Sequence, residues 1–529
     1  MSLSGHLPRV QTRRVPILRA LAVCGVVILF ASACSGGDGE PPLTPPPSGS
    51  PSPTTSAGTG LPPERVTFYG ADAGDQAAAV VTGDFNGDAA TDVVVGASLG
   101  DGPDNSRSDG GEAYLFLGPF PEGGSLDASG GEYDAIFYGA TAGDTLGRTL
   151  AAGDFNGDGF DDLVMAAPAA TEQAGAVYMM LGGEWPEQTD FAEADPDVLM
   201  RGGAGGDFAG LALTSTDVDG DSVSELIIGA LLADGPDESR ADAGAVYVLR
   251  GQELVAGDGV DLGSVSSVVH GARPGDRLGE ALATGDFNGD GMPDLILVAT
   301  FSAGPDESRP GTGASYVLEA PVAFPFDLAA AAPRLTVFGV DKGDQLGHSI
   351  GAGDTNGDGA ADLWLGAVSA DGPGNESNLM GEGALMLGGI GRSGVIDTTA
   401  GGADAIIFGP EAEARLGRSA TVGDVDADGR ADMLISAPNV VSRSGRIYVF
   451  LGDQDYPQDA SGADITLSGL DAGDILGHES FGMPSLAVAT VAGDERPALL
   501  ISAPGGDGPD NKRTDCGEVY IIPGSLLGS

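Results

Sequence analysis

The sequence predicts an all-β protein, a seven-bladed β-propeller built from four-stranded antiparallel blades. Three observations lead to this prediction. An acidic stretch recurs along the chain at intervals of 63 to 70 residues, and each copy is followed by the same succession of short segments. The apolar runs in these segments are short, partly β-branched and bounded by Gly, Asp and Pro, which is typical of strands. Four such strands in each of seven units indicate a propeller.

The first 64 residues are expected to lie outside the propeller. Residues 1–33 resemble a signal peptide, because four arginines precede the apolar run LAVCGVVILFASA at 21–33, which is too short to span a membrane stably. ASAC at 31–34 resembles the lipobox of bacterial lipoproteins, with Cys34 as the lipidated residue, and it also fits an ordinary signal-peptidase site. Residues 34–64 are rich in Pro, Gly, Ser and Thr and predict a solvated linker.

The propeller is expected over residues 65–524, followed by a tail at 525–529. The fifth unit contains the strands HSIGAGD, DLWLGAV, EGALMLGG and DAIIFG in order. Runs such as DLILVAT are apolar on both faces, as expected for strands in a blade that lies between two others. The first run, RVTFYG, matches a fourth strand and the last, GEVYIIPG, matches a third strand. We therefore expect the two ends of the chain to complete one blade, which leaves no free blade edge.

The acidic stretch, DFNGDGFDD at 154–162, has the composition of a calcium loop. Ca²⁺ prefers six to eight oxygen ligands, and side chains at positions 1, 3, 5 and 9 with the carbonyl at position 7 provide them if glycines at positions 4 and 6 allow a tight turn. An EF-hand is excluded because position 12 is apolar in all six copies. Metal-free Asx turns are the alternative. We favour calcium, because closely spaced carboxylates repel by about 1–4 kcal/mol per pair without a cation.

Six units carry this ligand set, in two cases with alanine in place of one of the glycines (Ala89 and Ala427). The predicted ligands are Asp84, Asn86, Asp88 and Asp92; Asp154, Asn156, Asp158 and Asp162; Asp217, Asp219, Asp221 and Glu225; Asp286, Asn288, Asp290 and Asp294; Asp354, Asn356, Asp358 and Asp362; and Asp424, Asp426, Asp428 and Asp432. The seventh unit has Thr490, Ala492, Asp494 and Ala498 at these positions and is expected not to bind. We therefore expect about six Ca²⁺ ions.

The repeat resembles the FG-GAP repeat of the integrin α-subunit head and its bacterial relatives. The resemblance rests on FYG at 137–139, the acidic stretch, and AAP at 166–168, and it covers residues 65–523. It implies a propeller whose calcium hairpins lie on one face. It also implies that partners bind the opposite face, formed by the loops from strand 4 to strand 1 and from strand 2 to strand 3.

Composition limits the possible partners and the sources of stability. The formal net charge of −54 disfavours binding to nucleic acid, because phosphate backbones are repelled. Once Cys24 has left with the signal peptide and Cys34 is lipidated, only Cys516 remains, so no intrachain disulfide framework exists. Extracellular calcium sites at about 1 mM Ca²⁺ contribute about 0.4–1.4 kcal/mol each. Six of them are expected to replace the stabilisation that disulfides provide.

These features together predict a calcium-binding adhesion or interaction scaffold for a protein or glycan partner. We expect an exported protein, an outer-membrane or cell-surface lipoprotein or otherwise a periplasmic or secreted one, that meets the membrane only through its lipid anchor. Two alternatives are a hydrolase-type enzyme with its site on the loop face and a purely structural envelope protein. The repeated loops of the type ADGPDESRADAG are either functional or plain turns.

We expect no enzymatic activity, because the sequence contains no nucleophile elbow, zincin motif or phosphate loop. His348 and His478 both follow Leu-Gly at the start of a first strand. Other units have Arg148, Glu280 and Arg418 at this position. The two histidines are therefore expected to occupy a variable position on the rim.

Overall fold

The computed structural model describes residues 59–121, 123–257, 259–452, 456–478, 485–491 and 496–527, with the side chains of residues 59, 237 and 400 excepted. The predicted signal peptide, Cys34 and most of the predicted linker lie outside these ranges. No helix of the described residues is long and apolar enough to cross a membrane.

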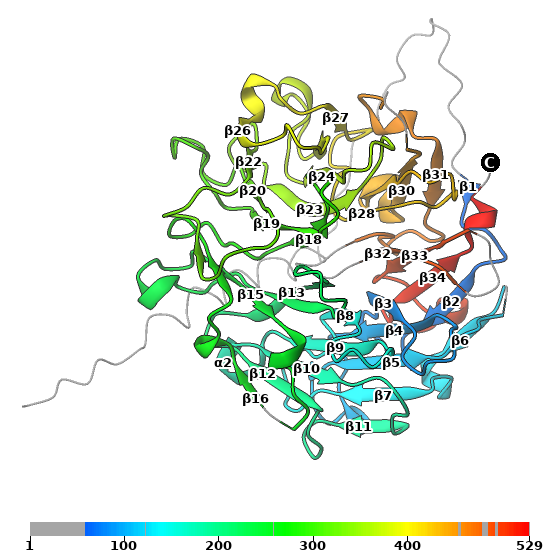
Figure 1. Ribbon diagram of the computed structural model, residues 1–529. Coiled ribbons are helices and arrows are strands. Elements are labelled where there is room, and N and C mark those ends of the chain that lie inside the picture. The colour runs from blue at the N-terminus through cyan, green and yellow to red at the C-terminus, as the bar shows by residue number, and fades with distance from the viewer. Residues whose placement is uncertain are drawn as a thin grey trace, which may run out of the picture. The chain divides into compact units, whose positions relative to one another are not determined.

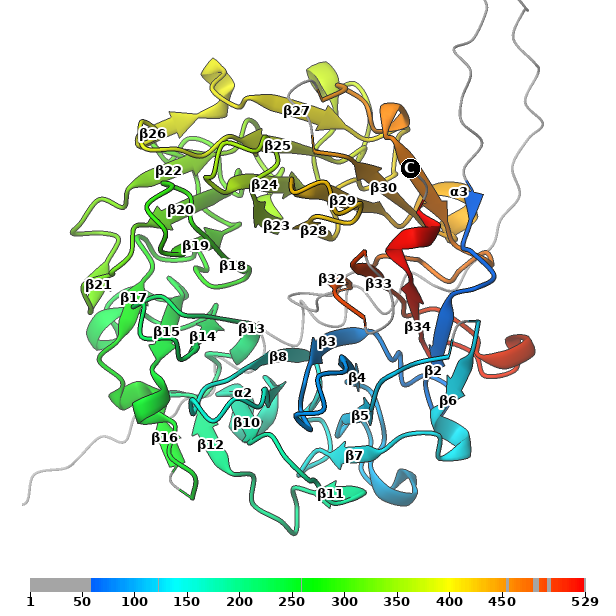
Figure 2. The same ribbon diagram turned by 45° about the vertical axis from the view of Figure 1, so that its right-hand side comes forward.

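Seven small, mostly antiparallel sheets form a ring (Figures 1 and 2), which confirms the predicted fold class. In blades one to four the strands are β3 (Ala79–Gly83), β4 (Asp92–Ala97), β5 (Glu112–Phe116) and β7 (Ala135–Tyr138); β8 (Thr149–Gly153), β9 (Asp162–Ala167), β10 (Ala176–Met180) and β12 (Val198–Arg201); β13 (Ala209–Thr216), β14 (Glu225–Ala230), β15 (Ala245–Leu249) and β17 (Val268–His270); and β18 (Leu282–Gly285), β19 (Asp294–Ala299), β20 (Ala314–Leu318) and β22 (Leu335–Phe338).

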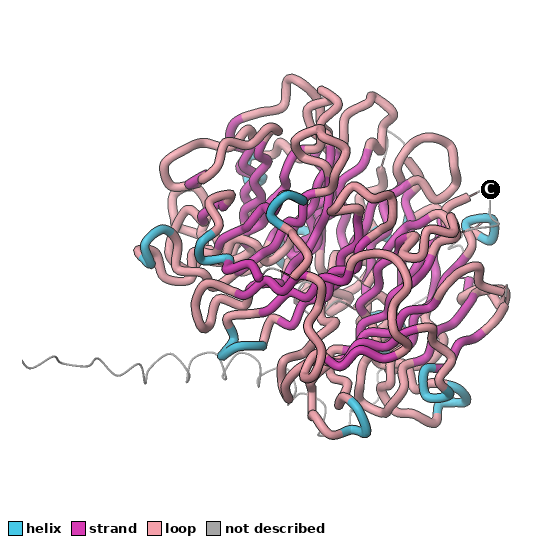
Figure 3. The backbone as a smooth tube through the Cα atoms, turned by 60° about the horizontal axis from the view of Figure 1, so that its bottom comes forward, coloured by secondary structure: helices cyan, strands magenta, loops and turns pink. Residues whose placement is uncertain are grey.

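In blades five to seven they are β23 (Leu346–Gly353), β24 (Asp362–Ala367), β25 (Glu382–Met386) and β27 (Ala405–Phe408); β28 (Ala420–Gly423), β29 (Asp432–Ala437), β30 (Arg446–Phe450) and β31 (Ile465–Ser468); and β32 (Leu486–Ala489), β33 (Ala498–Ala503), β34 (Glu518–Ile522) and β2 (Val66–Tyr69). The first strand of each blade lies innermost and contacts the first strands of the two neighbouring blades. The short helices α2 (Ala170–Gln173) and α3 (Val440–Arg443) lie in connections between strands, as do the 3₁₀ turns except the one that follows the last strand; Figure 3 shows these helical segments among the loops.

The ring closes as the sequence predicts. β2, near the N-terminal end of the described chain, pairs antiparallel with β34 near the C-terminal end, with Val66 opposite Ile521 and Tyr69 opposite Glu518. The seventh blade is thus completed by both ends of the chain. Residues before the predicted boundary at residue 65 also contact the propeller. β1 (Thr59–Gly60) pairs with β31, and Leu61 is buried in the core.

Six of the seven sheets have a fifth strand, where the sequence predicts four. The additional strands are β6 (Ser125–Asp127), β11 (Gln188–Asp190), β16 (Gly259–Asp261), β21 (Phe326–Asp327), β26 (Gly394–Asp397) and β1. Each belongs to the chain of the following blade and pairs in parallel with the fourth strand of the preceding one. With two to four residues and little apolar character, these segments lack the hydrophobic run by which the other strands are recognised.

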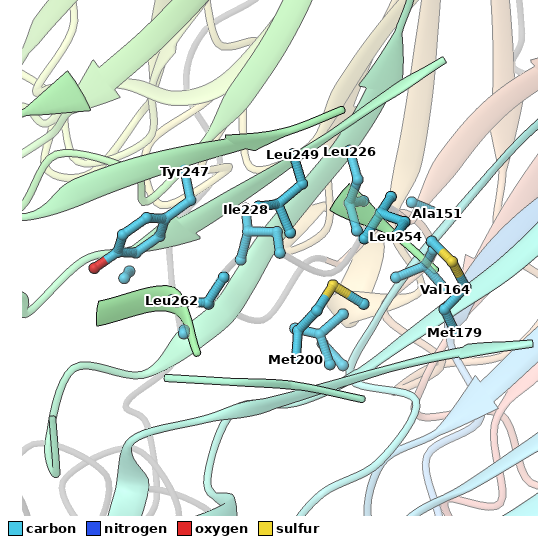
Figure 4. Close-up of a cluster of buried hydrophobic side chains, with 14 of the residues drawn as sticks. Ala151, Val164, Met179, Met200, Leu226, Ile228, Tyr247, Leu249, Leu254 and Leu262 are labelled. Atoms are coloured by element: carbon cyan, nitrogen blue, oxygen red, sulfur yellow. The ribbon is translucent and has the colours of Figure 1, made fainter. Parts of the chain in front are cut away.

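The hydrophobic core lies between adjacent blades. The second strand of every blade is buried along its whole length. In Figure 4, Val164 and Met179 of the second blade face Leu226 and Ile228 of the third. Each fully buried side chain of this kind contributes about 1.5–3 kcal/mol relative to an exposed one. This packing explains why the strands are apolar on both faces.

Ion pairs join neighbouring blades at the loop face. In the loop from β19 to β20, the Arg309 guanidinium pairs with Asp397 of β26 at 2.7 Å and donates to the carbonyls of Gly339 and Val340 at 2.6 and 2.7 Å. Because β26 belongs to the chain of the next blade, this arginine connects two blades. The equivalent pairs are Arg107–Asp190, Arg240–Asp327 and Arg513–Asp127. The arginines of the repeated Gly-Pro-Asp loops therefore have a structural role.

Candidate metal centres

The acidic stretches form the hairpins between the first and second strands of the first six blades. In the second blade, Asp154 receives three backbone N–H groups: Oδ1 accepts from Gly157 at 2.7 Å and Asp158 at 3.1 Å, and Oδ2 accepts from Gly159 at 2.9 Å. Gly157 and Gly159 have φ of 75° and 90°, a region that disfavours other residues. The first aspartate is bound in the same way, to at least two N–H groups, in the other hairpins.

The carboxylate at position 9 is the first residue of the second strand and is buried. Asp162 is fully buried; its Oδ2 accepts from the Phe155 N–H at 3.0 Å and its Oδ1 from the Gly182 N–H at 2.8 Å. The equivalent buried residues are Asp92, Glu225, Asp294, Asp362 and Asp432. This position thus fixes the hairpin to the blade and also presents a carboxylate to the loop.

Without a cation, the electrostatics of these loops disfavour ionisation. Burial raises the pKa of Asp162 to about 6; the N–H groups of Gly182 and Phe155 oppose this rise, and the charges of Asp158 and Asp154 add to it. The pKa also rises to about 6 for Asp92, Asp294 and Asp432 and to about 7 for Glu225. A bound dication would reverse this effect, because it favours the charged carboxylates.

Two hairpins bring three carboxylates within the reach of one ion. The groups are Asp217, Asp219 and Glu225, and Asp424, Asp426 and Asp432, and in each group ligand oxygens lie within 4.8 Å of one another. Oδ1 of Asp219 is buried and has no hydrogen-bond partner. An additional cation would satisfy this oxygen, so the donor set fits a hard dication such as Ca²⁺.

The other four hairpins carry asparagine at position 3. Asn156 donates to Asp158 at 2.9 Å, and its Oδ1 accepts the Asp158 N–H at 2.8 Å, which leaves one lone pair on the amide oxygen. In these four hairpins the predicted ligands share one short loop, but among the described residues only the other two hairpins bring three carboxylates within 4.8 Å of one another. In the seventh unit, Thr490 and Ala498 are described, whereas Ala492 and Asp494 lie outside the described residues.

A second polar cluster, which sequence reasoning missed, lies where the first strands begin. Nδ1 of His348 is 3.8 Å from Oε1 of Glu280 in the adjacent blade, and Thr300 donates to the other oxygen of Glu280. Burial and then the charge of Arg418 lower the pKa of His348, and the same two causes lower that of His478 to about 3. These residues come from four blades; Glu280 and His348 are buried, whereas Arg418 and His478 are partly buried. They form a cluster where the sequence predicts a variable rim position.

The loop face is hollowed next to the second blade. A cavity of about 600 Å³ is lined by Asp144, Tyr178, Phe191 and Arg201 among others, and the rings of Tyr178 and Phe191 stack at 4.7 Å. A similar cavity of about 430 Å³ lies at the first blade. Both are on the face opposite the hairpins, where the sequence analysis expects a partner.

Comparison with known proteins agrees with the repeat pattern. The family described as FG-GAP repeat matches residues 146–180, 209–249, 278–318 and 416–450. The chain contains FG-GAP repeats. It is also similar to an integrin, being 29% identical over 235 residues to integrin alpha-PS2 of Drosophila melanogaster, which covers 43% of this chain and 15% of the integrin.

Phospholipases are also among the relatives of this FG-GAP propeller. Phosphatidylinositol-glycan-specific phospholipase D of Bos taurus is 30% identical over 243 residues, covering 46% of this chain and 28% of the relative. The phospholipase of the same name from Dictyostelium discoideum is 24% identical over 407 residues, covering 71% and 41%. The chain thus spans less than half the length of each of these relatives.

Solved structures of rhamnogalacturonan lyases align with much of this chain at low TM-scores. Lyase YesX aligns with 11% identity and a TM-score of 0.43 over 85% of this chain and 72% of its own. The Bacillus licheniformis lyase PL11 aligns with 14% identity and a TM-score of 0.39 over 86% and 74%. At these TM-scores the likeness does not inform the function of the FG-GAP propeller.

The prediction that the chain is not an enzyme is wrong, because phospholipases stand among its curated relatives. That prediction depended on the absence of short catalytic motifs. Such motifs detect only groups that are close in sequence, and a propeller brings together groups from separate blades. Glu280 and His348, which are 68 residues apart in the sequence and 3.8 Å apart in space, illustrate this limit.

Proposed function

We propose that this FG-GAP propeller is an exported, calcium-binding interaction module that binds a protein or glycan at the cell surface or in the periplasm. The observation that carries the proposal is the set of six hairpins, each of which gathers at least three carboxylates within one short loop. The integrin relatives support a role in adhesion, and the cavities of the loop face provide room for a partner. A lipid anchor on Cys34 would hold the module at the membrane.

The calcium part of the proposal predicts a large stabilisation. We expect the melting temperature to rise strongly from EGTA to millimolar Ca²⁺, with about six ions bound by calorimetric titration. Asp219→Asn should lower the stoichiometry by one, because this residue contributes the unpartnered buried oxygen. Asp306→Asn, a change in an exposed loop on the opposite face, is the control. A stoichiometry of one or two would contradict the proposal, since most stretches would then be metal-free turns.

The interaction part predicts binding at the loop face. In Ca²⁺, the protein should bind a defined glycan or protein in array experiments, and Arg201→Glu in the 600 Å³ cavity should weaken that binding about tenfold or more. Arg496→Glu, on the hairpin face in the seventh unit, which is expected not to bind calcium, should leave it unchanged. Equal effects of both substitutions would show that only net charge matters and would contradict a specific site.

A hydrolytic enzyme is the second candidate function, favoured by the phospholipase relatives and by the convergence of Glu280 and His348. Glu280 is buried, and burial raises its pKa, as expected for a carboxyl that exchanges protons. Bis(p-nitrophenyl) phosphate and a glycosylphosphatidylinositol-anchored protein are suitable substrates for an assay. Turnover that Glu280→Gln abolishes would support this candidate, and no turnover by the wild-type chain would exclude it for these substrates.

A further inference from the structure

The cavity of the first blade is unusually rich in tyrosine. It measures about 430 Å³ and is lined by Tyr114, Tyr133 and Tyr138, and the ring centroids of Tyr114 and Tyr133 are 5.6 Å apart. Its walls come from the turn after the seventh blade, the loop from β4 to β5, and the turn that follows β6. Three aromatic rings around one cavity provide the negative ring faces that attract organic cations.

The same cavity is acidic. Asp72, Asp104 and Glu112 line it, and its described lining contains no Arg, Lys or His. Glu112 is buried, and its two oxygens accept from the Gly102 N–H at 3.0 Å and from the Tyr114 hydroxyl. Burial raises the pKa of Tyr138 to about 12, and the charges of Tyr133, Glu112 and Asp104 add to this rise. These groups therefore lie close enough to interact electrostatically. The carboxylates therefore add Coulombic attraction for a cation to that of the rings.

In the seventh blade, the equivalent pair of a glutamate and a tyrosine lies beside an arginine. There Tyr520 donates to Glu518, and Glu518 accepts the Gly508 N–H at 3.0 Å, which repeats the arrangement of Tyr114, Glu112 and Gly102. The guanidinium carbon of Arg65 lies 5.3 Å from the centre of the Tyr520 ring. The chain thus supplies its own cation to the Glu–Tyr pair of the seventh blade.

The first blade has no such internal cation in its described lining. The residue that corresponds to Arg65, directly before the fourth strand, is Asp134, which accepts the Leu117 N–H at 2.8 Å. The second blade differs as well, because Arg201 ends its fourth strand at the place of Tyr138 and lines the cavity there. The first blade alone among these three combines the Glu–Tyr pair with an open cavity and no basic lining residue in the described chain.

We propose that the first-blade cavity binds an organic cation, a guanidinium or alkylammonium group, against Tyr133 and Tyr138 and beside Glu112 and Asp104. This proposal rests on the proposed function, because it takes the loop face as the partner surface. It deepens that function by naming the chemical group that the partner presents. It does not depend on calcium chemistry. Failure of calcium binding and failure of cation binding would therefore be observed separately.

The test measures binding of methylguanidinium, tetramethylammonium and the neutral tert-butanol to the full chain in millimolar Ca²⁺ by saturation-transfer NMR. At least one of the cations should bind about tenfold or more tightly than tert-butanol, and the preferred cation identifies the group. Tyr138→Arg, which installs the residue of the second blade, should weaken cation binding about tenfold. Tyr69→Arg, the same change at the matched position of the seventh blade, should leave it unchanged.

Two further variants keep the proposal open to refutation. If Tyr138→Arg does not fold, Tyr133→Ala and the exposed Asp104→Asn should each weaken cation binding severalfold while the melting temperature stays that of the wild type. Equal affinity for cations and tert-butanol would overturn the proposal. Unchanged cation affinity in Tyr133→Ala and Asp104→Asn would overturn it as well.

Discussion

At the scale of the residue, the hairpins follow their sequence pattern closely. Position 4 has φ between 60° and 78° in the six acidic hairpins, and position 6 has φ between 64° and 93°, so the glycines predicted at these places have a conformational reason. The exceptions in the sequence keep the same backbone. Ala427 at position 4 has φ of 60°, and Ala89 and Ser222 at position 6 have φ of 64° and 70°. These alanines are held in a region that costs about 1–2 kcal/mol for a residue with a Cβ.

Replacing such an alanine by glycine should therefore stabilise the protein. We expect Ala427→Gly to raise the free energy of unfolding by about 1 kcal/mol, measured by urea denaturation in EGTA. Ala431→Gly lies in the same hairpin at a position without positive φ and should lower it by about 0.5–1 kcal/mol. A destabilising effect of Ala427→Gly would show that the hairpin does not hold the strained backbone described here.

Side-chain types predicted the acidic loops, but they did not reveal the roles of residues whose partners come from distant repeats. The ligand pattern is local, so spacing within nine residues was enough to identify it. Glu280, His348 and His478 carry no local pattern, because only the closure of the ring brings their blades together. A useful signal was the Leu-Gly pair at the start of the first strand in five of the seven units, because in all five the next residue is polar or charged.

At the scale of the element, the fifth strands show which signal was present and overlooked. Each of the five strands β6, β11, β16, β21 and β26 ends in aspartate, and that carboxylate caps the following turn, as Asp397 does by accepting the Thr399 N–H at 3.2 Å. Hydrophobic periodicity cannot detect strands of two to four residues. The recurring aspartate before each fourth strand could have located them, and it also provides the partner of the loop arginines.

Loss of one of these interblade arginines should destabilise the propeller. We expect Arg309→Gln to lower the free energy of unfolding by about 2–3 kcal/mol at pH 7, because two carbonyls and one carboxylate lose charged donors. Lys512→Gln, which removes an ion pair with both side chains more than 70% exposed, should have no measurable effect. Urea denaturation of both variants measures the difference.

The effect of Arg309→Gln should also depend on pH. Burial opposes ionisation of Asp397, but hydrogen bonds from Thr399 and Arg309 outweigh it and hold its pKa below the ordinary value. A depressed pKa contributes stability above the ordinary pKa of about 4, and this contribution is lost as the pH falls through the lower folded value. The destabilisation should therefore be full above pH 5 and smaller at pH 3. An effect that grows at low pH would contradict this assignment.

At the scale of the whole molecule, the acidic composition produces buried carboxyl groups outside the hairpins as well. Burial, followed by the charge of Glu112, raises the pKa of Asp75 to about 7, and Asp72 and Asp101 also face it. Burial and then Asp344 raise the pKa of Glu382 to about 7. The sequence contains the excess of negative charge and predicts the ring that carries it. It does not predict which carboxylates are buried, because their burial depends on how one blade packs against the next.

These two groups give the chain a pH dependence with a definite sign. A raised folded pKa means that the stability it contributes is present below the unfolded pKa and is lost as the pH rises through about 7. We expect the wild type in EGTA to melt at a higher temperature at pH 6.5 than at pH 8.5. In the double variant Asp75→Asn, Glu382→Gln, the difference in unfolding free energy between pH 6.5 and pH 8.5 should be smaller than in the wild type by about 1–2 kcal/mol.

Asp306→Asn serves as the control, because its exposed carboxyl titrates below this range. Folded His348 and His478 stay neutral because their folded pKa values are lowered. In the unfolded chain they bind protons near the ordinary pKa of about 6.5, which opposes the carboxyl slope equally in the wild type and in the double variant. If the double variant kept the full wild-type slope, the pH dependence would have to come from other buried carboxyl groups. Millimolar Ca²⁺ would then abolish the share of the hairpins and leave that of Asp276, Asp344 and Asp474, whose pKa values are also raised to about 6.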